Sequence, residues 1–450
     1  MMMDLIKEAL HHFREIIKID TTNQLETEYK VAEYLKGVLE KEGIASQLVY
    51  SPNNRASIIA KLAGNNEAEK PLVLLSHMDV VEATEEEWTF PPFSATIDGG
   101  NIWGRGTLDT KQLTIMHLMA FIQLKRSNQP LNGNIFFIAT ADEENGSKEG
   151  MEFVSSEYPE FFEKATILSE GGGFIVPCED EIYMLFAAGE KGTARVKLTS
   201  FGDGGHAGSP PENQAVLILT QALRIINHLK LPSGDYPILH YFHHELKGMM
   251  SKEGEQGDLV RRLFDYMAHM TFTPELLTVG GEQLNVIPYK AEAILEFRTL
   301  PNQTREQFES YLKEWHLPPN VNCELLSFEK GYESDPEEEI IKLFKETSSL
   351  YGKKIIWVPF TALGKTDGRF VGDVSSQIYG LSPTLTPFTE VLKRVHNKDE
   401  RIEVESFEYG VKLMTAVLKK LCISNGGGES VSGTKRETEP SARKFTRTKY

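Results

Sequence analysis

The chain has 450 residues, of which 40% are hydrophobic and 25% are charged, and its formal net charge at pH 7 is −17. Repulsion at this charge argues against nucleic-acid phosphates and anionic membrane surfaces as binding partners. The composition is that of a soluble globular protein, and the length predicts about two or three domains.

Cysteine usage and the N-terminal segment bear on the compartment. Cys178, Cys323 and Cys422 are too widely spaced for a disulfide framework or a Cys-x-x-Cys metal site, which favours a reducing cytoplasm. Residues 4–19 carry apolar side chains at helical spacing among charged ones, so they predict an amphipathic helix and not a signal peptide. No stretch approaches the roughly 20 apolar residues of a membrane-spanning helix.

Runs with helical and with strand periodicity alternate through the first 190 residues. Helices are predicted at residues 26–42 and 110–125, and strands at residues 45–50, 56–62, 71–76, 135–139 and 165–168. The run at 71–76 is almost entirely apolar, as in a strand that is buried on both faces. This alternation predicts an α/β domain with a largely parallel, mixed sheet.

The pattern changes near Glu190. Residues 192–200 alternate with a period of two, which indicates a strand with one solvated face. Further along, helices are predicted at residues 213–229, 257–269 and 304–315, and strands at 282–287, 291–298 and 322–328. Strand, helix, two strands, helix and strand is the order of the split βαβ motif, so we expect residues 191–332 to form an inserted, ferredoxin-like α+β domain.

The α/β pattern resumes at Asp335, with helices predicted at residues 335–351 and 406–421 and a strand at 354–358. Residues 1–190 and 333–424 are therefore expected to form one discontinuous domain, which the second domain interrupts. Residues 425–450 are rich in Gly, Ser, Thr and basic residues and are predicted to be a disordered tail.

The acidic triplet Asp142-Glu143-Glu144 lies three residues beyond the apolar run at residues 135–138. α/β proteins place their sites at the carboxyl ends of strands, although three acids can also simply open a solvated turn. Further candidates are His77 with Asp79, Asp109, Glu170 and His396. Two histidines and several carboxylates at one edge of a sheet form the ligand set of a two-zinc site, because both groups suit Zn²⁺ and a carboxylate can bridge two ions.

Other motifs carry less weight. His240, His243, His244 and Glu245 could bind a metal, but their order is not the His-Glu-x-x-His of zinc-binding helices, which favours a solvent-exposed cluster. The sequence has no Gly-x-Ser-x-Gly elbow and no P-loop, so serine hydrolysis and nucleotide chemistry have no support.

The sequence resembles the M20 metallopeptidases, a family that includes aminoacylase, acetylornithine and succinyl-diaminopimelate deacylases and glutamate carboxypeptidase. The resemblance runs through nearly the whole chain up to the tail. Its matching stretches are residues 76–81 (Ser-His-Met-Asp-Val-Val), 88–93 (Trp-Thr-Phe-Pro-Pro-Phe), 104–111 (Gly-Arg-Gly-Thr-Leu-Asp-Thr-Lys), 142–144, 205–207, 285–288 and His396.

The resemblance implies a ligand set. One zinc ion would be bound by His77, Asp109 and Glu170, and the other by Asp109, Glu144 and His396, with Asp109 bridging both. Cobalt and manganese are alternatives to zinc in the cell.

The resemblance also implies supporting roles. Asp79 resembles the carboxylate that holds the ring of His77 in one tautomer. Glu143 resembles the general base, which removes a proton from a metal-activated water and later delivers it to the leaving amine. Some relatives have an Asp directly before the residue at the fourth ligand position, whereas this chain has Ser169, so Glu170 is the expected ligand. Relatives with a Glu ligand at that position include deacylases, which favours a deacylase over an aminopeptidase.

The inserted domain resembles the family's lid, which often also forms a dimer. His206 matches a lid histidine that reaches an active site, commonly that of the other subunit, and stabilises an oxyanion, although it could be a simple loop residue between glycines. Asn285 and Arg298 match lid positions that meet substrate, and Arg298 could instead lie on the sheet face. Arg369 matches an arginine that binds a substrate carboxylate through two parallel donors; the alternative is a solvated turn arginine.

These features predict a zinc-dependent amidohydrolase that cleaves an amide bond next to a free carboxylate in a small N-acyl amino acid or short peptide. An N-acyl-amino acid deacylase and a carboxypeptidase-like dipeptidase both fit. The alternatives are a two-zinc aminopeptidase that requires a free N-terminus and a non-catalytic zinc-binding scaffold. The lid resemblance adds the expectation of a homodimer.

Overall fold

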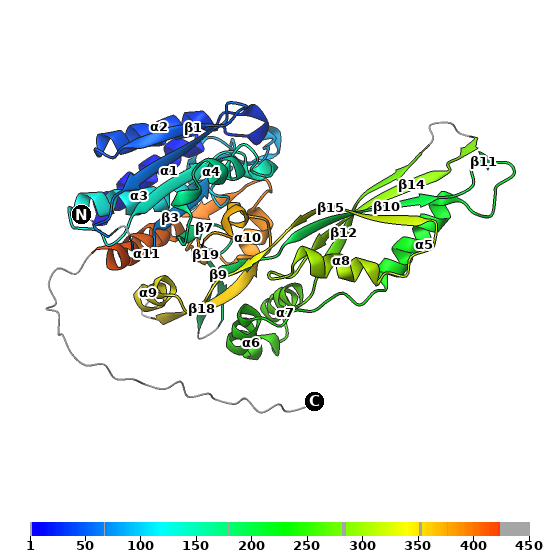
Figure 1. The fold of residues 1–450 in the computed structure, drawn as a ribbon. Helices are drawn as coiled ribbons and strands as arrows, with labels where there is room; N and C mark the ends of the chain where they lie inside the picture. Colours follow the sequence, from blue (N-terminus) through cyan, green and yellow to red (C-terminus); the bar gives the residue numbers. More distant parts are fainter. Residues whose placement is uncertain are drawn as a thin grey trace.

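The computed structural model describes residues 2–66, 68–178, 181–280, 285–350, 353–375 and 377–423. Figure 1 shows a large body, built from both ends of the described chain, and an elongated arm, built from its middle part. The predicted tail at residues 425–450 lies outside the described residues.

A mixed sheet forms the centre of the large body. Its strands lie in the order β1-β2-β6-β3-β7-β19-β9-β18-β17, and β8 and β16 both pair with β9. Pairing is parallel from β6 through β3 and β7 to β19, while β1, β2 and β6 pair antiparallel. Their bounds are Ser46–Tyr50 (β1), Ala56–Leu62 (β2), Leu72–His77 (β3), Ile135–Thr140 (β6), Thr166–Ser169 (β7), Phe174–Pro177 (β8), Ile182–Glu190 (β9), Tyr332–Glu333 (β16), Ser349–Leu350 (β17), Lys353–Ala362 (β18) and Gln377–Gly380 (β19).

Both faces of this sheet are covered, which explains the almost continuous apolar run in β3. Leu72 and Leu74 belong to the larger hydrophobic core, whereas Val73 and Leu75 belong to a second core on the other face. On the side of the larger core, α3 contacts β3 and also packs against α1 and α11. The helices of the large body are Met2–Ile17 (α1), Glu28–Lys41 (α2), Lys111–Ser127 (α3), Met151–Glu157 (α4), Glu339–Thr347 (α9), Phe388–Arg394 (α10) and Val404–Cys422 (α11).

The arm contains a four-stranded antiparallel sheet in the order β12-β14-β10-β15, the strand order of a split βαβ fold. Helix α5 packs on β10 and β14, and α8 packs on β15. The elements are Thr193–Phe201 (β10), Gly205–His206 (β11), Ala215–Asn227 (α5), Thr271–Val279 (β12), Val286–Ile287 (β13), Lys290–Arg298 (β14), Arg305–Lys313 (α8) and Val321–Glu329 (β15).

The second strand of this sheet is not where the sequence pattern placed it. The strand expected at residues 282–287 is reduced to β13 in the described part, and residues 282–284 lie outside it. Its place beside β14 is taken by β12, whose register shifts between Pro274 and Leu276. A proline and mostly exposed side chains remove the alternating apolar pattern from this edge strand.

Two helices inside the segment expected to form the lid pack on the large body. Helices α6 (Pro237–Met250) and α7 (Glu255–Ala268) pack against each other, and α6 also contacts β18. Ile238, Phe242 and Leu246 belong to the larger core. His240 and His244 on α6 are exposed, as expected for a surface cluster. Among the described residues, no helix is long and apolar enough to span a membrane.

Candidate metal centre

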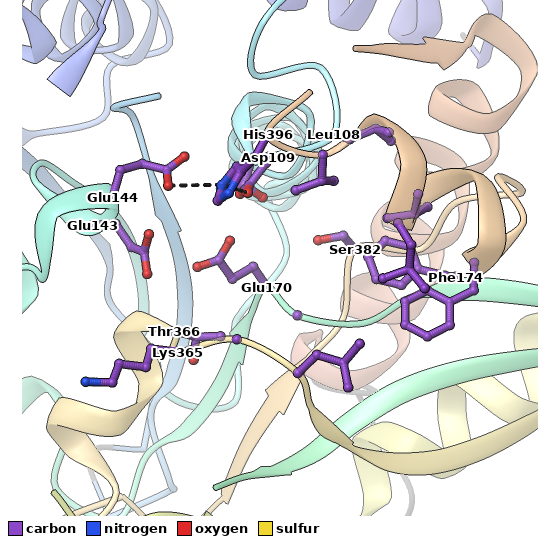
Figure 2. A pocket seen from close by; sticks show the side chains of 18 of the residues that line it. Leu108, Asp109, Glu143, Glu144, Glu170, Phe174, Lys365, Thr366, Ser382 and His396 are labelled. Carbon is purple, nitrogen blue, oxygen red and sulfur yellow. Dashed lines mark ion pairs between the residues drawn. The ribbon is translucent and has the colours of Figure 1, made fainter. Parts of the chain in front are cut away.

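The candidate ligand side chains and Glu143 meet at one edge of the central sheet. His77 ends β3, Glu143 and Glu144 lie in a short 3-10 helix that begins three residues after the end of β6, and Glu170 directly follows β7. Because β6, β3 and β7 are parallel neighbours, their carboxyl ends lie side by side. Figure 2 shows the carboxylates of Glu143, Glu144 and Glu170 pointing into one cavity.

Asp109 joins two groups of possible ligands. Its Oδ1 lies 3.2 Å from Nε2 of His77, and its Oδ2 lies 3.0 Å from Nε2 of His396. His77 Nε2 also lies 3.2 Å from Oε2 of Glu170, and His396 Nε2 lies 3.1 Å from Oε2 of Glu144. Two donor sets therefore share Asp109, and they are the two sets that the resemblance implies.

The tautomer of His77 tests whether this arrangement fits a cation. Its Nδ1 lies 3.0 Å from the backbone oxygen of Asp79, which requires an N–H on Nδ1. In the neutral ring Nε2 is then a lone pair that faces two carboxylate oxygens, so three acceptors converge without a donor between them. A divalent cation fits such a convergence, because neutral imidazole and carboxylate are its ordinary ligands.

The negative charge that gathers in this cluster also favours a bound cation. Burial and the nearby charge of Glu170 raise the pKa of Glu143 well above its usual value. Burial raises the pKa of Glu170 to about 7, and the charges of Asp109 and Asp367 add to this effect. Glu144 is nearly buried, and its Oε1 has no hydrogen-bond partner among the described residues. Cations in the cavity would offset this repulsion.

A second grouping of donor atoms concerns Glu143. Ligand atoms of His77, Asp109 and Glu144 all lie within 4.8 Å of one another, and so do those of His77, Glu143 and Glu170. Glu143 is thus close enough to bind a metal as well as to act as a base. The guanidinium of Arg369 lies close to it, with Nη1 4.0 Å from Oε1 of Glu143.

Asp79 fixes the segment that carries the two glutamates. It is fully buried, and its Oδ1 and Oδ2 accept the backbone N–H groups of Glu143 and Glu144, both at 3.0 Å. Asn23 donates to Oδ2 at 2.7 Å. The carboxylate approaches Nδ1 of His77 only to 3.6 Å, farther than the backbone oxygen of the same residue. Asp79 therefore orients His77 chiefly through its backbone and the two glutamates through its side chain.

Glu400, a buried residue absent from the predicted site, holds the loop of Asp109. Its carboxylate accepts the backbone N–H groups of Gly106, Leu108 and Asp109 at 3.1, 2.7 and 3.2 Å, and it pairs with Arg105 at 2.8 Å. Glu400 precedes β20 (Arg401–Glu403), which forms a small sheet with β5 (Asn101–Trp103) and β4 (Thr96–Asp98). The segment of His396 is thereby tied to the loop of Asp109.

Two other buried acids support the turn after β6. Asp142, to which the sequence assigned no role, pairs with Arg55 at 3.1 Å and accepts the backbone N–H of Glu149 at 3.0 Å. Asp367 accepts the hydroxyl groups of Thr140 at 2.6 Å and Ser147 at 2.5 Å. Their partners are distant along the chain, so spacing gives no signal for these contacts.

A cavity of about 350 Å³ opens beside the ligands. Its polar end contains the five carboxylate and imidazole side chains Asp109, Glu143, Glu144, Glu170 and His396, and its other walls are largely apolar. Figure 2 shows Phe174 and Leu108 on the side of Glu170 opposite Glu143. A substrate in this cavity would contact the ligand cluster and an apolar wall together.

Three residues expected to meet substrate lie elsewhere in the described chain. His206 is exposed in β11, which Figure 1 shows at the far end of the arm, and Asn285 accepts the neighbouring Ala207 N–H at 3.0 Å. Arg298 ends β14 and pairs with Glu296 at 3.1 Å. Arg369 alone of the predicted substrate-binding residues lies next to the cluster, where its guanidinium stacks over Phe370 at 4.4 Å.

Comparisons with known proteins agree with this architecture. Residues 73–420 match the model of Peptidase family M20/M25/M40. The N-fatty-acyl-amino acid synthase/hydrolase PM20D1 of Homo sapiens is 26% identical over 439 residues, which cover 92% of this chain and 87% of that protein. A probable succinyl-diaminopimelate desuccinylase of Staphylococcus aureus (strain N315) is 27% identical over 421 residues, with coverages of 89% and 94%.

Solved structures share the fold. The M20 family metallo-carboxypeptidase Sso-CP2 from Sulfolobus solfataricus matches with a TM-score of 0.68 at 20% identity, covering 92% of this chain and 98% of that one. The dinuclear metal-binding peptidase YXEP of Bacillus subtilis, also of the M20 family, matches with a TM-score of 0.56 at 13% identity, covering 92% and 98%. The chain therefore belongs to peptidase family M20/M25/M40 and is a hydrolase of that family with a candidate metal site at the strand ends of its central sheet.

Proposed function

We propose that this protein is a two-zinc amidohydrolase that cleaves an amide bond next to a free carboxylate, as an N-acyl-amino acid deacylase or a carboxypeptidase-like dipeptidase. The observation that carries the proposal is the position of Asp109, which offers one oxygen to each of two histidines. This arrangement supports a carboxylate that bridges two cations.

His77, Asp109 and Glu170 would hold one metal ion, and Asp109, Glu144 and His396 the other. Divalent ions in such a site polarise a carbonyl and make water acidic enough to lose a proton near neutral pH. Zn²⁺ fits the mixed imidazole and carboxylate donors, and Co²⁺ and Mn²⁺ are the alternatives.

Glu143 is the proposed general base. Its side chain lines the cavity, and its backbone is fixed by Asp79. Glu143 takes a proton from water as the oxygen adds to the acyl carbon. It then delivers this proton to the amide nitrogen as the C–N bond breaks, which leaves a carboxylic acid and a free amine.

Recognition of the substrate carboxylate is assigned to Arg369. Its guanidinium lies beside Glu143, so a carboxylate bound there would sit next to the scissile amide. The names of similar proteins, which include a metallo-carboxypeptidase and a fatty-acyl-amino acid hydrolase, support a substrate of this kind.

The roles proposed for His206 and Asn285 require either a second copy of the chain or closure of the arm. In one copy, His206 and Asn285 lie at the distal end of the arm, so they could act at a site only if another subunit brought them there or the arm closed. The edge strand β12 exposes Leu276, Leu277 and Val279, which suits contact with a partner. We propose a homodimer through the arm, in which His206 stabilises the oxyanion of the partner's site and Asn285 and Arg298 contact substrate.

A matched substrate screen tests the proposed function. Protein stripped with EDTA and reloaded with Zn²⁺, Co²⁺ or Mn²⁺ is assayed on N-acyl amino acids, on dipeptides, and on both after conversion of the carboxylate to an amide. Metal-dependent turnover that requires the carboxylate and tolerates a blocked N-terminus supports the proposal. A strict requirement for a free N-terminus would instead identify an aminopeptidase, and bound metal without any turnover would identify a scaffold.

A further inference from the structure

The guanidinium of Arg369 is buried and keeps a free donor. Its side chain is 8% exposed, and its Nη1 donates to the backbone oxygen of Thr366 at 2.7 Å. Its Nε has no hydrogen-bond partner among the described residues, and Oε2 of Glu329 lies 3.9 Å away, beyond hydrogen-bonding distance. Buried donors are rarely left unpaired, so the free N–H suits an anionic ligand. The direction of this donor depends on what holds Thr366.

Glu190 holds Thr366 by two hydrogen bonds. Its Oε2 accepts the backbone N–H of Thr366 at 3.0 Å and the hydroxyl group of the same residue at 2.7 Å. Glu190 is 1% exposed, and both bonds go to one oxygen of its carboxyl group. Figure 2 shows Thr366 at the edge of the cavity that Glu143 and Glu170 also line. The carbonyl group that binds Arg369 is therefore positioned by a residue outside this cavity lining.

The sheet explains why Glu190 lies against this loop. It is the last residue of β9, and residues 363–369 follow β18, the parallel neighbour of β9. The pairing shifts by one residue after Phe360, so Ala188 is an extra residue in β9. Such a bulge changes the direction of the side chains that follow it. The carboxyl group of Glu190 thus meets the loop that continues from β18.

The same loop has a second attachment on its other side. Asp367 accepts the hydroxyl groups of Thr140 and Ser147, which lie before and after Glu143 in the chain. One attachment therefore comes from the turn of the proposed base and the other from Glu190. Together they set the distance between that base and the guanidinium.

Glu190 also lies at the junction of the large body and the arm. The next residue, Lys191, starts the connection to β10, and its ammonium group lies 4.1 Å from the centre of the Tyr266 ring. The alternative to a role in recognition is that Glu190 only stabilises this junction. The two roles differ in what happens to a substrate carboxylate when the carboxyl group of Glu190 is removed.

We propose that Glu190 is a positioning residue for substrate recognition: by holding Thr366, it places the guanidinium of Arg369 where the substrate carboxylate binds. The inference rests on the proposed function, because it requires that Arg369 binds that carboxylate. It adds a buried residue that determines this recognition without belonging to the cavity lining.

The test uses the metal-loaded enzyme with an N-acyl amino acid and the corresponding carboxamide. The KM ratio is defined as KM of the carboxylate substrate divided by KM of the carboxamide. Glu190→Ala removes the acceptor for Thr366 and lets the guanidinium move away from its binding position. We expect the KM ratio to rise about fivefold, with KM of the carboxamide changed less than about twofold. An equal change for both substrates, or no change, overturns the inference.

Two further variants separate positioning from folding. Glu190→Gln keeps the shape of the side chain and one oxygen acceptor, so it should keep the KM ratio within about twofold of the unmodified protein. Thr366→Val removes the hydroxyl bond and leaves the backbone bond to Glu190, so folding should be preserved. We expect T366V to raise the KM ratio about threefold. An unchanged ratio in T366V overturns the inference even if E190A does not fold.

The matched control is Glu333→Ala at the same junction. Glu333 lies on β16, where its carboxyl group accepts the backbone N–H of Ile238 at 3.1 Å and the amide of Asn302 at 2.6 Å. It therefore loses two hydrogen bonds, as E190A does, but on elements away from the loop of Arg369. E333A should leave the KM ratio unchanged. A rise as large as that in E190A would show that any disturbance of the junction has this effect, and would overturn the inference.

A double substitution tests whether Glu190 acts through Arg369. Residues that act through one another have non-additive effects. In the background of Arg369→Met, which removes the guanidinium, Glu190→Ala should raise the KM ratio no further. A further rise of about fivefold would mean that Glu190 acts by another route and would overturn the inference.

The proposed function and the inference fail in different ways. If R369M raises the KM ratio and E190A does not, carboxylate recognition stands and only the role of Glu190 falls. If R369M leaves the ratio unchanged, or if no N-acyl amino acid is hydrolysed, the corresponding part of the proposed function falls and the inference falls with it.

Discussion

The carboxylate of Asp79 accepts the backbone N–H groups of Glu143 and Glu144, one on each oxygen. The residue expected to orient His77 thus also sets the position of the proposed general base, Glu143, and of Glu144, a proposed ligand to the second metal ion. Asp79→Asn keeps the size of the side chain but replaces one acceptor oxygen with a donor. We expect metal affinity and kcat/KM each to fall about 10- to 100-fold, as measured by metal titration and steady-state kinetics.

The control for this substitution is Asp98→Asn, because Asp98 is exposed at the end of β4. D98N should change neither the metal affinity nor kcat/KM. If D79N behaved like D98N, the bonds of Asp79 to the two glutamates would have no bearing on the site.

Substitution of Glu143 tests whether this residue acts as a base or as a metal ligand. Glu143→Gln preserves the shape of the side chain and removes its ability to accept a proton, so kcat should fall about 10²- to 10⁴-fold while metal content stays unchanged. Elemental analysis and steady-state kinetics on the same preparation measure both effects. Loss of one metal equivalent would show instead that Glu143 is a ligand, which its distance to His77 and Glu170 permits.

The matched control for E143Q is Glu157→Gln, an exposed glutamate at the end of α4. It should retain both full turnover and full metal content. Full turnover in E143Q would remove Glu143 from the mechanism.

The sequence was sufficient to predict that four of the candidate residues lie together at strand ends. His77, Glu143, Glu144 and Glu170 follow apolar runs, and parallel pairing of β6, β3 and β7 brings such positions together whatever the details of the loops. His396 was a weaker candidate, and its role as a ligand was implied only by the family resemblance. It follows the seven-residue helix α10 with a φ of 58°, in a segment without periodicity.

The supporting contacts could not be read from the sequence. Glu400 and Asp142 are held by partners that only the folded chain brings close. The strand β12 was missed for a different reason. Its exposed side chains and Pro274 give no alternating pattern, and its pairing with β14 is a consequence of tertiary structure.

Arg369 provides a test of carboxylate recognition. Arg369→Met keeps an unbranched apolar stem and removes the guanidinium, which stacks over Phe370. We expect KM for an N-acyl amino acid to rise about 10- to 100-fold, because a charge-assisted hydrogen bond contributes about 1.5–3 kcal/mol, with a smaller effect on the corresponding carboxamide. The ratio of the two KM values is the relevant measurement, since a general disturbance of Glu143 would affect both substrates alike.

Arg305→Met, at an exposed arginine on α8, is the control for R369M and should leave that ratio unchanged. Equal losses for the carboxylate and the carboxamide in R369M would refute carboxylate binding by Arg369.

His117 makes stability depend on pH independently of the metal site. It is fully buried in α3, and neither ring nitrogen has a hydrogen-bond partner among the described residues. Burial lowers its pKa from 6.5 to about 3. Below pH 6.5 the unfolded chain takes up a proton at this residue while the folded chain does not, so stability is complete above that pH and declines as the pH falls toward 3. Between pH 7 and pH 5 the loss from this residue is about 2 kcal/mol.

The His117→Leu variant should remove this contribution. We expect its free energy of unfolding to exceed that of the unmodified protein at pH 7 by about 1–3 kcal/mol, because two unsatisfied buried nitrogens are removed, and the difference should widen by about 2 kcal/mol at pH 5. Urea denaturation of the metal-free proteins at both pH values measures it, with the exposed His316→Gln as a control that leaves the pH dependence unchanged. A difference that is the same at pH 7 and pH 5 would mean that His117 is protonated in the folded protein.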